Sequence, residues 1–276
     1  MNLPEKLGYI LLAVLLILLT VAAVYAVFAA KEYYSAVEKL EELKRKQDVG
    51  DEYECVPESE IPLTQFEHIL SESKHEVSDK YALDYFDDAV FVGDSRTEGL
   101  FLYSGIAEKT EATSYAWRGF TTTDVLENKK FNIDGKYLTG ADALRQNKEF
   151  TKVYIMLGVN ELAPGSSDEF IERYDKIVSA ALEANPKARI IIQSIIPLSD
   201  WKSELSDYVN NENTAEFNSA LFDYAQENGY IWLDVGSLLS DANGALNPAC
   251  DCGDGIHLTQ EACKIWFEYL CYYTYF

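Results

Sequence analysis

The sequence predicts an α/β fold in which helices cover both faces of a parallel β-sheet. Two observations lead to this prediction. From about residue 63 onward, short and almost continuous apolar runs recur, and patterns typical of amphipathic helices separate them. Strands that are buried on both faces read as unbroken apolar runs, because a parallel sheet carries helices above and below it.

Five of these runs are expected to form the strands of the sheet, the second being weaker than the others. In order along the chain they span residues 89–92, 112–115, 152–160, 188–198 and 229–236. One helix is expected to begin at Ser95, directly after the first strand. The other expected helices span residues 65–81, 168–184, 214–228 and 259–272.

An uncharged apolar run at residues 8–30 precedes this domain. As a helix rising about 1.5 Å per residue it would span roughly 34 Å, enough for a bilayer core of about 30 Å. A cleaved signal peptide is the alternative, but apolar regions of signal peptides usually run only about 7–15 residues. The sequence therefore predicts a short tail at 1–7, a transmembrane helix at 8–30, a charged helix and linker at 31–62, and a folded domain at 63–276.

Two arguments give opposite orientations for this predicted single-pass anchor. Lys6 precedes the apolar run, and five basic residues lie between positions 31 and 46, which by the positive-inside rule would keep the C-terminal side in the cytoplasm. A single N-terminal anchor followed by a large domain is, however, the usual arrangement for export. We expect the C-terminal domain to be extracytoplasmic.

The formal net charge of −23 argues against a nucleic-acid partner, since phosphates favour clustered Lys and Arg. The five cysteines form no readable disulfide framework. Cys250, Cys252 and His257 could together suggest a metal, but zinc sites want four ligands, usually with cysteines spaced two to four apart. No metal site is predicted.

Chemistry-bearing residues follow the predicted strands, where open α/β sheets bind their ligands. Ser95 comes after the first strand, Gly119 after the second and Asn160 after the third, while Asp254 and His257 precede the final helix. These are the parts that acyl transfer needs. They supply a hydroxyl nucleophile, a histidine base with a carboxylate partner, and N–H donors for an oxyanion.

Each residue taken alone also has a plain structural interpretation. Ser95 could cap the following helix, and Gly119 could serve only a turn. Asn160 could form an Asx turn, Asp254 could be a turn residue, and His257 could be structural. It is the combination of the four motifs, in order and at expected ligand-binding positions, that favours catalysis.

From about residue 87 to the C-terminus, the chain resembles the SGNH hydrolase family, the GDSL-type esterases and lipases. The resemblance rests on "FVGDSR" with Ser95, "WRGF" with Gly119, "LGVNE" with Asn160, and "DGIHL" with Asp254 and His257. Single motifs of this kind are weak. All four in order, with the aspartate three residues before the histidine, are fairly specific.

The resemblance implies a three-layer α/β/α sandwich with a five-stranded parallel, flavodoxin-like sheet. It implies that Ser95 is the nucleophile, His257 the base and Asp254 its partner. The backbone N–H groups of Ser95 and Gly119 and the side chain of Asn160 would form the oxyanion hole. No metal or organic cofactor is expected.

Two positions depart from the family pattern. Arg96 follows the serine where the lipase-like branch has leucine, and Glu161 follows Asn160 where family members often have aspartate. We expect neither residue to touch the proton relay or the oxyanion donors, so the departures put the substrate in doubt rather than the chemistry.

The expected function is a membrane-anchored esterase that removes acetyl or other small acyl groups, with acylated carbohydrate of the envelope or extracellular space as substrate. Tyr115, Trp117 and Phe120 could stack against a sugar ring, or they could belong to the core. A lipase or thioesterase acting on longer chains, an acyltransferase to sugar, and a non-catalytic binding domain remain as alternatives.

Overall fold

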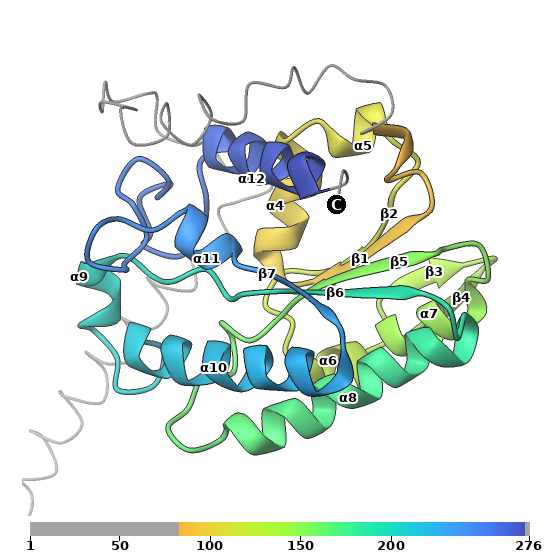
Figure 1. The fold of residues 1–276 in the computed structure, drawn as a ribbon, viewed down its shortest axis with the longest axis horizontal. Coiled ribbons are helices and arrows are strands. Elements are labelled where there is room, and N and C mark those ends of the chain that lie inside the picture. The colour runs from red at the N-terminus through yellow and green to blue at the C-terminus, as the bar shows by residue number, and fades with distance from the viewer. Residues whose placement is uncertain (1–82, 274–276) are drawn as a thin grey trace, which may run out of the picture. The chain divides into compact units, whose positions relative to one another are not determined.

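The computed structural model describes residues 83–273, which form a five-stranded parallel sheet with helices on both faces (Figure 1). The strand order is β2-β1-β5-β6-β7. The strands are β1 (Ala89–Gly93), β2 (Thr113–Ala116), β5 (Lys152–Met156), β6 (Arg189–Gln193) and β7 (Ile231–Leu233). The predicted fold class of this domain is confirmed.

Two layers of helices cover the sheet, as Figure 1 shows. On one face lie α4 (Ser95–Tyr103), α5 (Ile106–Lys109), α11 (Val235–Leu238) and α12 (Gln260–Tyr272). On the other face lie α6 (Thr122–Glu127), α7 (Gly140–Gln146), α8 (Ser167–Ala184) and α10 (Asn211–Asn228). The short helix α9 (Asp200–Ser203) follows the carboxyl end of β6.

Alternate residues of the strands belong to two separate apolar cores, one on each face of the sheet. In β1, Val90 and Val92 pack with residues of α7, α8 and α10, whereas Phe91 packs with Leu100 of α4 and Trp266 of α12. Every residue of β1 and of β5 is buried. This is why their sequences show no polar alternation, since both faces of a parallel sheet are covered.

The predicted helices lie close to the observed ones, with α10 starting earlier than expected. The sequence pattern placed its start at residue 214, but the helix begins at Asn211. Asn210 caps it, because its side chain accepts a hydrogen bond of 2.8 Å from the backbone N–H of Asn213. Gly229, with φ of 69°, ends the helix in the left-handed conformation that glycine adopts readily.

Three predicted strands are longer than the observed ones, because buried residues also follow each strand in a loop or, after β7, in helix α11. The apolar runs at 152–160, 188–198 and 229–236 continue past the ends of β5, β6 and β7. Ile195, Ile196 and Leu198 are almost fully buried, although they follow β6 in a loop. The loop after the strand is itself part of the core, and an apolar run therefore cannot distinguish it from a strand.

A two-stranded hairpin between α6 and α7 was not anticipated. It pairs β3 (Phe131–Ile133) with β4 (Lys136–Leu138) in antiparallel fashion. Its turn uses Asp134 and Gly135, both with positive φ, as an Asp-Gly hairpin turn requires. This dipeptide was a readable signal, whereas the short strands beside it have no apolar repeat.

The predicted segments at 1–7, 8–30 and 31–62, and the predicted helix at 65–81, lie outside the described residues. Between residues 83 and 273, none of the helices combines the length and the apolar character needed to cross a membrane.

Candidate active site

The turn after β1 leaves the side chain of Ser95 available for chemistry. The helix cap is Asp94, whose carboxylate accepts a hydrogen bond of 2.9 Å from the backbone N–H of Arg96. Gly93 is required just before it, since a Cβ there would lie 2.9 Å from the backbone oxygen of Met156. The alternative that Ser95 itself caps α4 is therefore wrong.

Ser95, His257 and Asp254 form a hydrogen-bonded chain. The Ser95 Oγ lies 2.9 Å from Nε2 of His257, and Nδ1 of the same ring lies 2.5 Å from Oδ2 of Asp254. The serine begins α4, while the other two residues come from the loop before α12. The structure thus brings together three predicted site residues from opposite ends of the domain.

Asp254 holds both the ring and the backbone of His257. Its Oδ1 accepts hydrogen bonds of 2.8 Å from the backbone N–H groups of Ile256 and His257. Partial burial acts to raise the pKa of the Asp254 carboxyl, but the hydrogen bonds and charge of His257 outweigh it and hold that pKa below its usual range. The carboxylate is therefore ionised at neutral pH and fixes the orientation of the imidazole.

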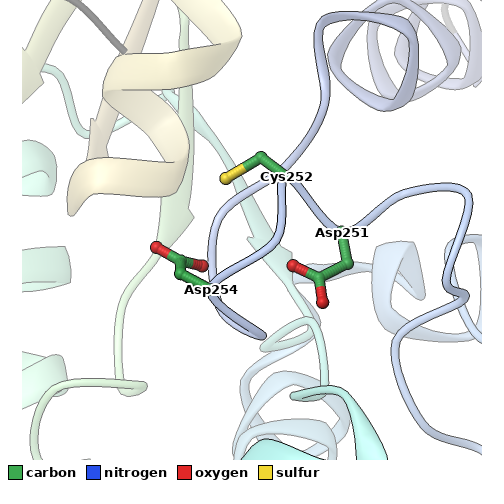
Figure 2. A group of neighbouring side chains, drawn as sticks. All are labelled: Asp251, Cys252 and Asp254. Carbon is green, nitrogen blue, oxygen red and sulfur yellow. The ribbon is translucent and has the colours of Figure 1, made fainter. Parts of the chain in front are cut away.

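The same loop contains the group Asp251, Cys252 and Asp254, each offering a ligand atom within 4.8 Å of the others (Figure 2). Asp251 Oδ1 already accepts hydrogen bonds of 2.8 Å from the N–H groups of Gly253 and Gly255. With Asp254 committed to His257, these carboxylates shape the loop. Cys250, one of the ligands considered from sequence, is buried, and burial raises the pKa of its thiol to about 12.

The turn that carries Gly119 lies against the end of β1. The backbone N–H of Trp117 donates to the oxygen of Gly93 at 3.3 Å. Gly119 has φ of 74° and no atom within 4 Å of the place where a Cβ would stand. It is thus an exposed turn glycine whose conformation L-residues disfavour.

Asn160 contacts this turn from the loop that follows β5. Its Nδ2 donates a hydrogen bond of 3.0 Å to the backbone oxygen of Phe120, the residue after Gly119. One amide N–H therefore positions the side chain, and the same nitrogen carries a second N–H. The structure brings the predicted donors Gly119 and Asn160 to adjoining loops.

A half-buried carboxylate that was not assigned to the site from sequence holds these two loops together. Glu161, next to Asn160, accepts hydrogen bonds from Thr122 through the backbone N–H at 2.6 Å and the hydroxyl at 2.7 Å. Arg173 of α8 binds the same carboxylate at 3.1 Å and the Thr122 hydroxyl at 2.9 Å. Thr122 begins α6, directly after the Gly119 turn.

Arg96 and Glu161, which we expected not to touch the proton relay or the oxyanion donors, bond neither of them through their side chains but hold the loops that carry them. Glu161 fastens the loops of Gly119 and Asn160, and Nε of Arg96 donates to the backbone oxygen of Ile256, beside His257, at 3.0 Å. Their departure from the family pattern was the available signal. Their partners, 39 and 160 residues away, could not be read from it.

The three aromatic residues singled out from sequence divide between core and surface. Tyr115 and Phe120 are 6% and 2% exposed and belong to the core. Trp117 is 39% exposed, and the Nζ of Lys130 lies 5.1 Å from its ring centroid. Of these three residues, only Trp117 has a ring that is exposed enough to contact a ligand.

A serine directly after a strand of a parallel sheet, within hydrogen-bonding distance of a histidine that is bound to an aspartate, is an arrangement known from α/β hydrolytic enzymes. In comparison with protein families, residues 91–265 match the GDSL-like lipase/acylhydrolase family. The chain belongs to this family, which agrees with the resemblance drawn from its four motifs. No curated protein matches the chain in sequence.

Solved structures share the fold at low sequence identity. A protein from Streptococcus pneumonia, provisionally assigned as a platelet activating factor, is 21% identical with a TM-score of 0.54, covering 75% of this chain and 95% of its own. A GDSL-like lipase from Bacteroides thetaiotaomicron is 19% identical with a TM-score of 0.51, with the same coverage of 75% and 95%. A carbohydrate acetylesterase from Sinorhizobium meliloti is 17% identical with a TM-score of 0.50, covering 68% and 98%.

The Glu161 contacts predict a loss of stability on truncation. Glu161→Ala leaves the Thr122 N–H and the Arg173 guanidinium without their carboxylate, and should lower the free energy of unfolding by about 1–3 kcal/mol. Glu169→Ala is the matched control, because this 79% exposed carboxylate lies 3.9 Å from the same Arg173. It should change stability by less than about 0.5 kcal/mol in chemical denaturation. Equal effects of the two variants would contradict the assignment.

Proposed function

We propose that the chain is a serine esterase that removes acetyl or other small acyl groups from carbohydrate, with Ser95 as nucleophile, His257 as general base and Asp254 as its partner. One observation carries this proposal. The Ser95 hydroxyl lies 2.9 Å from a histidine nitrogen whose other ring nitrogen is bound to a carboxylate. A serine hydroxyl becomes an effective nucleophile only when such a base takes its proton.

The geometry supports a two-step reaction. Ser95 Oγ bonds to the acyl carbon while its proton passes to Nε2 of His257, and the alcohol then leaves with that proton. The oxygen of a water molecule then bonds to the acyl carbon while its proton passes to His257, which gives that proton to Ser95 as the acid departs. Throughout, Asp254 holds the tautomer with the proton on Nδ1 and stabilises the imidazolium.

The negative oxygen of each tetrahedral intermediate needs donors that are already in place. Ser95 stands in the first turn of α4, where backbone N–H groups have no partner within the helix and the helix dipole is positive. Gly119 N–H and the Asn160 amide supply the other donors in this proposal. Each such donor is typically worth about 3–4 kcal/mol in the transition state.

Exposed indole rings on a loop and on a short helix beside the site support a carbohydrate substrate. Trp117 comes two residues before Gly119. Trp201 lies on α9 and is 48% exposed, and the preceding Ser199 donates its N–H to the oxygen of Gly255, within the catalytic loop, at 3.0 Å. Broad aromatic faces at a polar surface offer the apolar contact that the ring of a sugar can stack against.

We further propose that residues 8–30 anchor the chain in a membrane and that the enzyme domain lies outside the cytoplasm. The support is the length of the uncharged apolar run. In a bacterial host, a tag placed after Phe276 should be removed by protease added to intact spheroplasts, whereas a cytoplasmic marker should survive. Protection of the tag until the membrane is permeabilised would reverse the orientation.

The function predicts serine-dependent ester hydrolysis that declines with acyl chain length. The full chain should release p-nitrophenol fastest from the acetyl ester, more slowly from the butyryl ester and least from the octanoyl ester. Ser95→Ala should abolish turnover on all three while the circular dichroism spectrum is unchanged. Acetylated oligosaccharides should then lose acetate only with the wild-type chain.

Other outcomes of this assay separate the alternatives. Rates that rise with chain length would favour a lipase or thioesterase. Turnover that survives in Ser95→Ala would move the nucleophile elsewhere. A folded wild-type chain without activity on esters or acetylated sugars would contradict hydrolysis.

The charge of Asp254 should not limit activity at mildly acidic or neutral pH. Because the pKa of Asp254 is held below its usual range, this group stays ionised between about pH 5 and pH 8, and loss of its charge should add no acid limb to kcat/KM in that interval. Asp254→Asn should lower kcat by about 10⁴-fold by favouring the wrong tautomer. Asp223→Asn, at an exposed position of α10, is the control and should leave kcat unchanged. An unchanged rate in Asp254→Asn would show that His257 needs no carboxylate.

A further inference from the structure

Arg96 is a fully buried cation directly after Ser95. It is 2% exposed, and burial lowers the pKa of its guanidinium to about 10, so the group remains charged at neutral pH. The negative charges of Asp94 and Asp254 act against burial and raise the pKa of the Arg96 guanidinium. Charged side chains are rarely buried unless their hydrogen bonds are satisfied, so the partners of this group indicate its purpose.

Those partners are backbone carbonyl oxygens from two loops. Nε donates to Ile256 at 3.0 Å, Nη1 donates to Ile196, and Nη2 donates to Pro197 at 3.3 Å. Ile256 immediately precedes His257, whereas Ile196 and Pro197 lie in the loop that follows β6. One planar side chain thus joins the start of the nucleophile helix to the loop of the base and to the loop at the carboxyl end of β6.

This arrangement constrains the distance between nucleophile and base. Ser95 and Arg96 are consecutive in the first turn of α4, and Ile256 and His257 are consecutive in the catalytic loop. Binding Arg96 to the Ile256 oxygen therefore sets where the imidazole stands relative to the serine. A lysine could keep the charge but not the planar fork that reaches several oxygens at once.

Resting on the proposed function, we infer that Arg96 is a positioning residue, whose guanidinium keeps His257 in register with Ser95 through the Ile256 carbonyl. It does not touch the reacting atoms. Arg96 therefore affects the rate at which each folded molecule reacts. A displacement of about 1 Å between a nucleophile and its base can lower the reaction rate about 10²-fold.

A fluorophosphonate tests this without any assumption about the natural acyl group. Ser95 Oγ bonds to phosphorus, fluoride leaves, and the serine proton passes to His257 and then to water. Intact-protein mass spectrometry of the full chain gives both the rate constant at saturating reagent and the final fraction labelled. A purely structural role would lower the final fraction and leave the rate of the competent molecules unchanged.

Arg96→Met should react at least about 10²-fold more slowly than wild type, with the same final fraction and the same half-saturating concentration. Arg96→Lys should fall between the two. Arg145→Met is the control, because this arginine is 41% exposed and pairs with Asp142 and Glu183 on the helices of the other face. It should react like the wild-type chain.

The results that would overturn the inference are distinct from those that would overturn the function. A wild-type rate in folded Arg96→Met, or a reduced final fraction with an unchanged rate, would overturn the inference alone. If Arg96→Met does not fold, Arg96→Lys decides, and a wild-type rate there would equally overturn it. A wild-type chain that is not labelled at Ser95 would overturn the proposed function and this inference with it.

Discussion

The hydrogen bond between Ser95 Oγ and His257 Nε2 is the contact on which the site depends, and it joins residues 162 positions apart. The serine is placed by a fully buried interior strand, β1, and by the helix that Asp94 caps. The histidine is placed by a loop in which Asp251 and Asp254 accept four backbone N–H bonds. Helix α12 then packs against α4, so the helix that begins at Ser95 and the helix that follows His257 share one apolar core.

Charged residues behind the reacting groups connect the loops around this bond. Glu161 links the loops of Gly119 and Asn160, and Arg96 links the helix that begins at Ser95 to the loop of His257. Each makes hydrogen bonds that an apolar side chain could not make. The groups to be held are backbone N–H and carbonyl groups that have no partner within a helix or strand. Removing one charged partner leaves those groups unsatisfied, which is costly inside a protein.

The sequence alone was sufficient to predict those parts of the structure that depend on residues close to one another in the chain. Apolar runs predicted β1 and β5, amphipathic repeats predicted α8, α10 and α12, and the motif around Asp254 and His257 was visible as five consecutive letters. It was insufficient where burial does not follow secondary structure. Ile195, Ile196 and Leu198 are as apolar as a strand but lie in a buried loop. The partners of Arg96 and Glu161 are set by tertiary contacts, which no local pattern encodes.

The most direct test is to locate the covalent bond that the nucleophile forms. The full chain would be labelled with a fluorophosphonate, digested, and its modified peptide sequenced by tandem mass spectrometry. A single phosphonyl group on Ser95, absent after denaturation before labelling, is the expected result. A phosphonyl group on another residue, or none on a folded chain, would contradict the assignment of Ser95 as the nucleophile presented by β1.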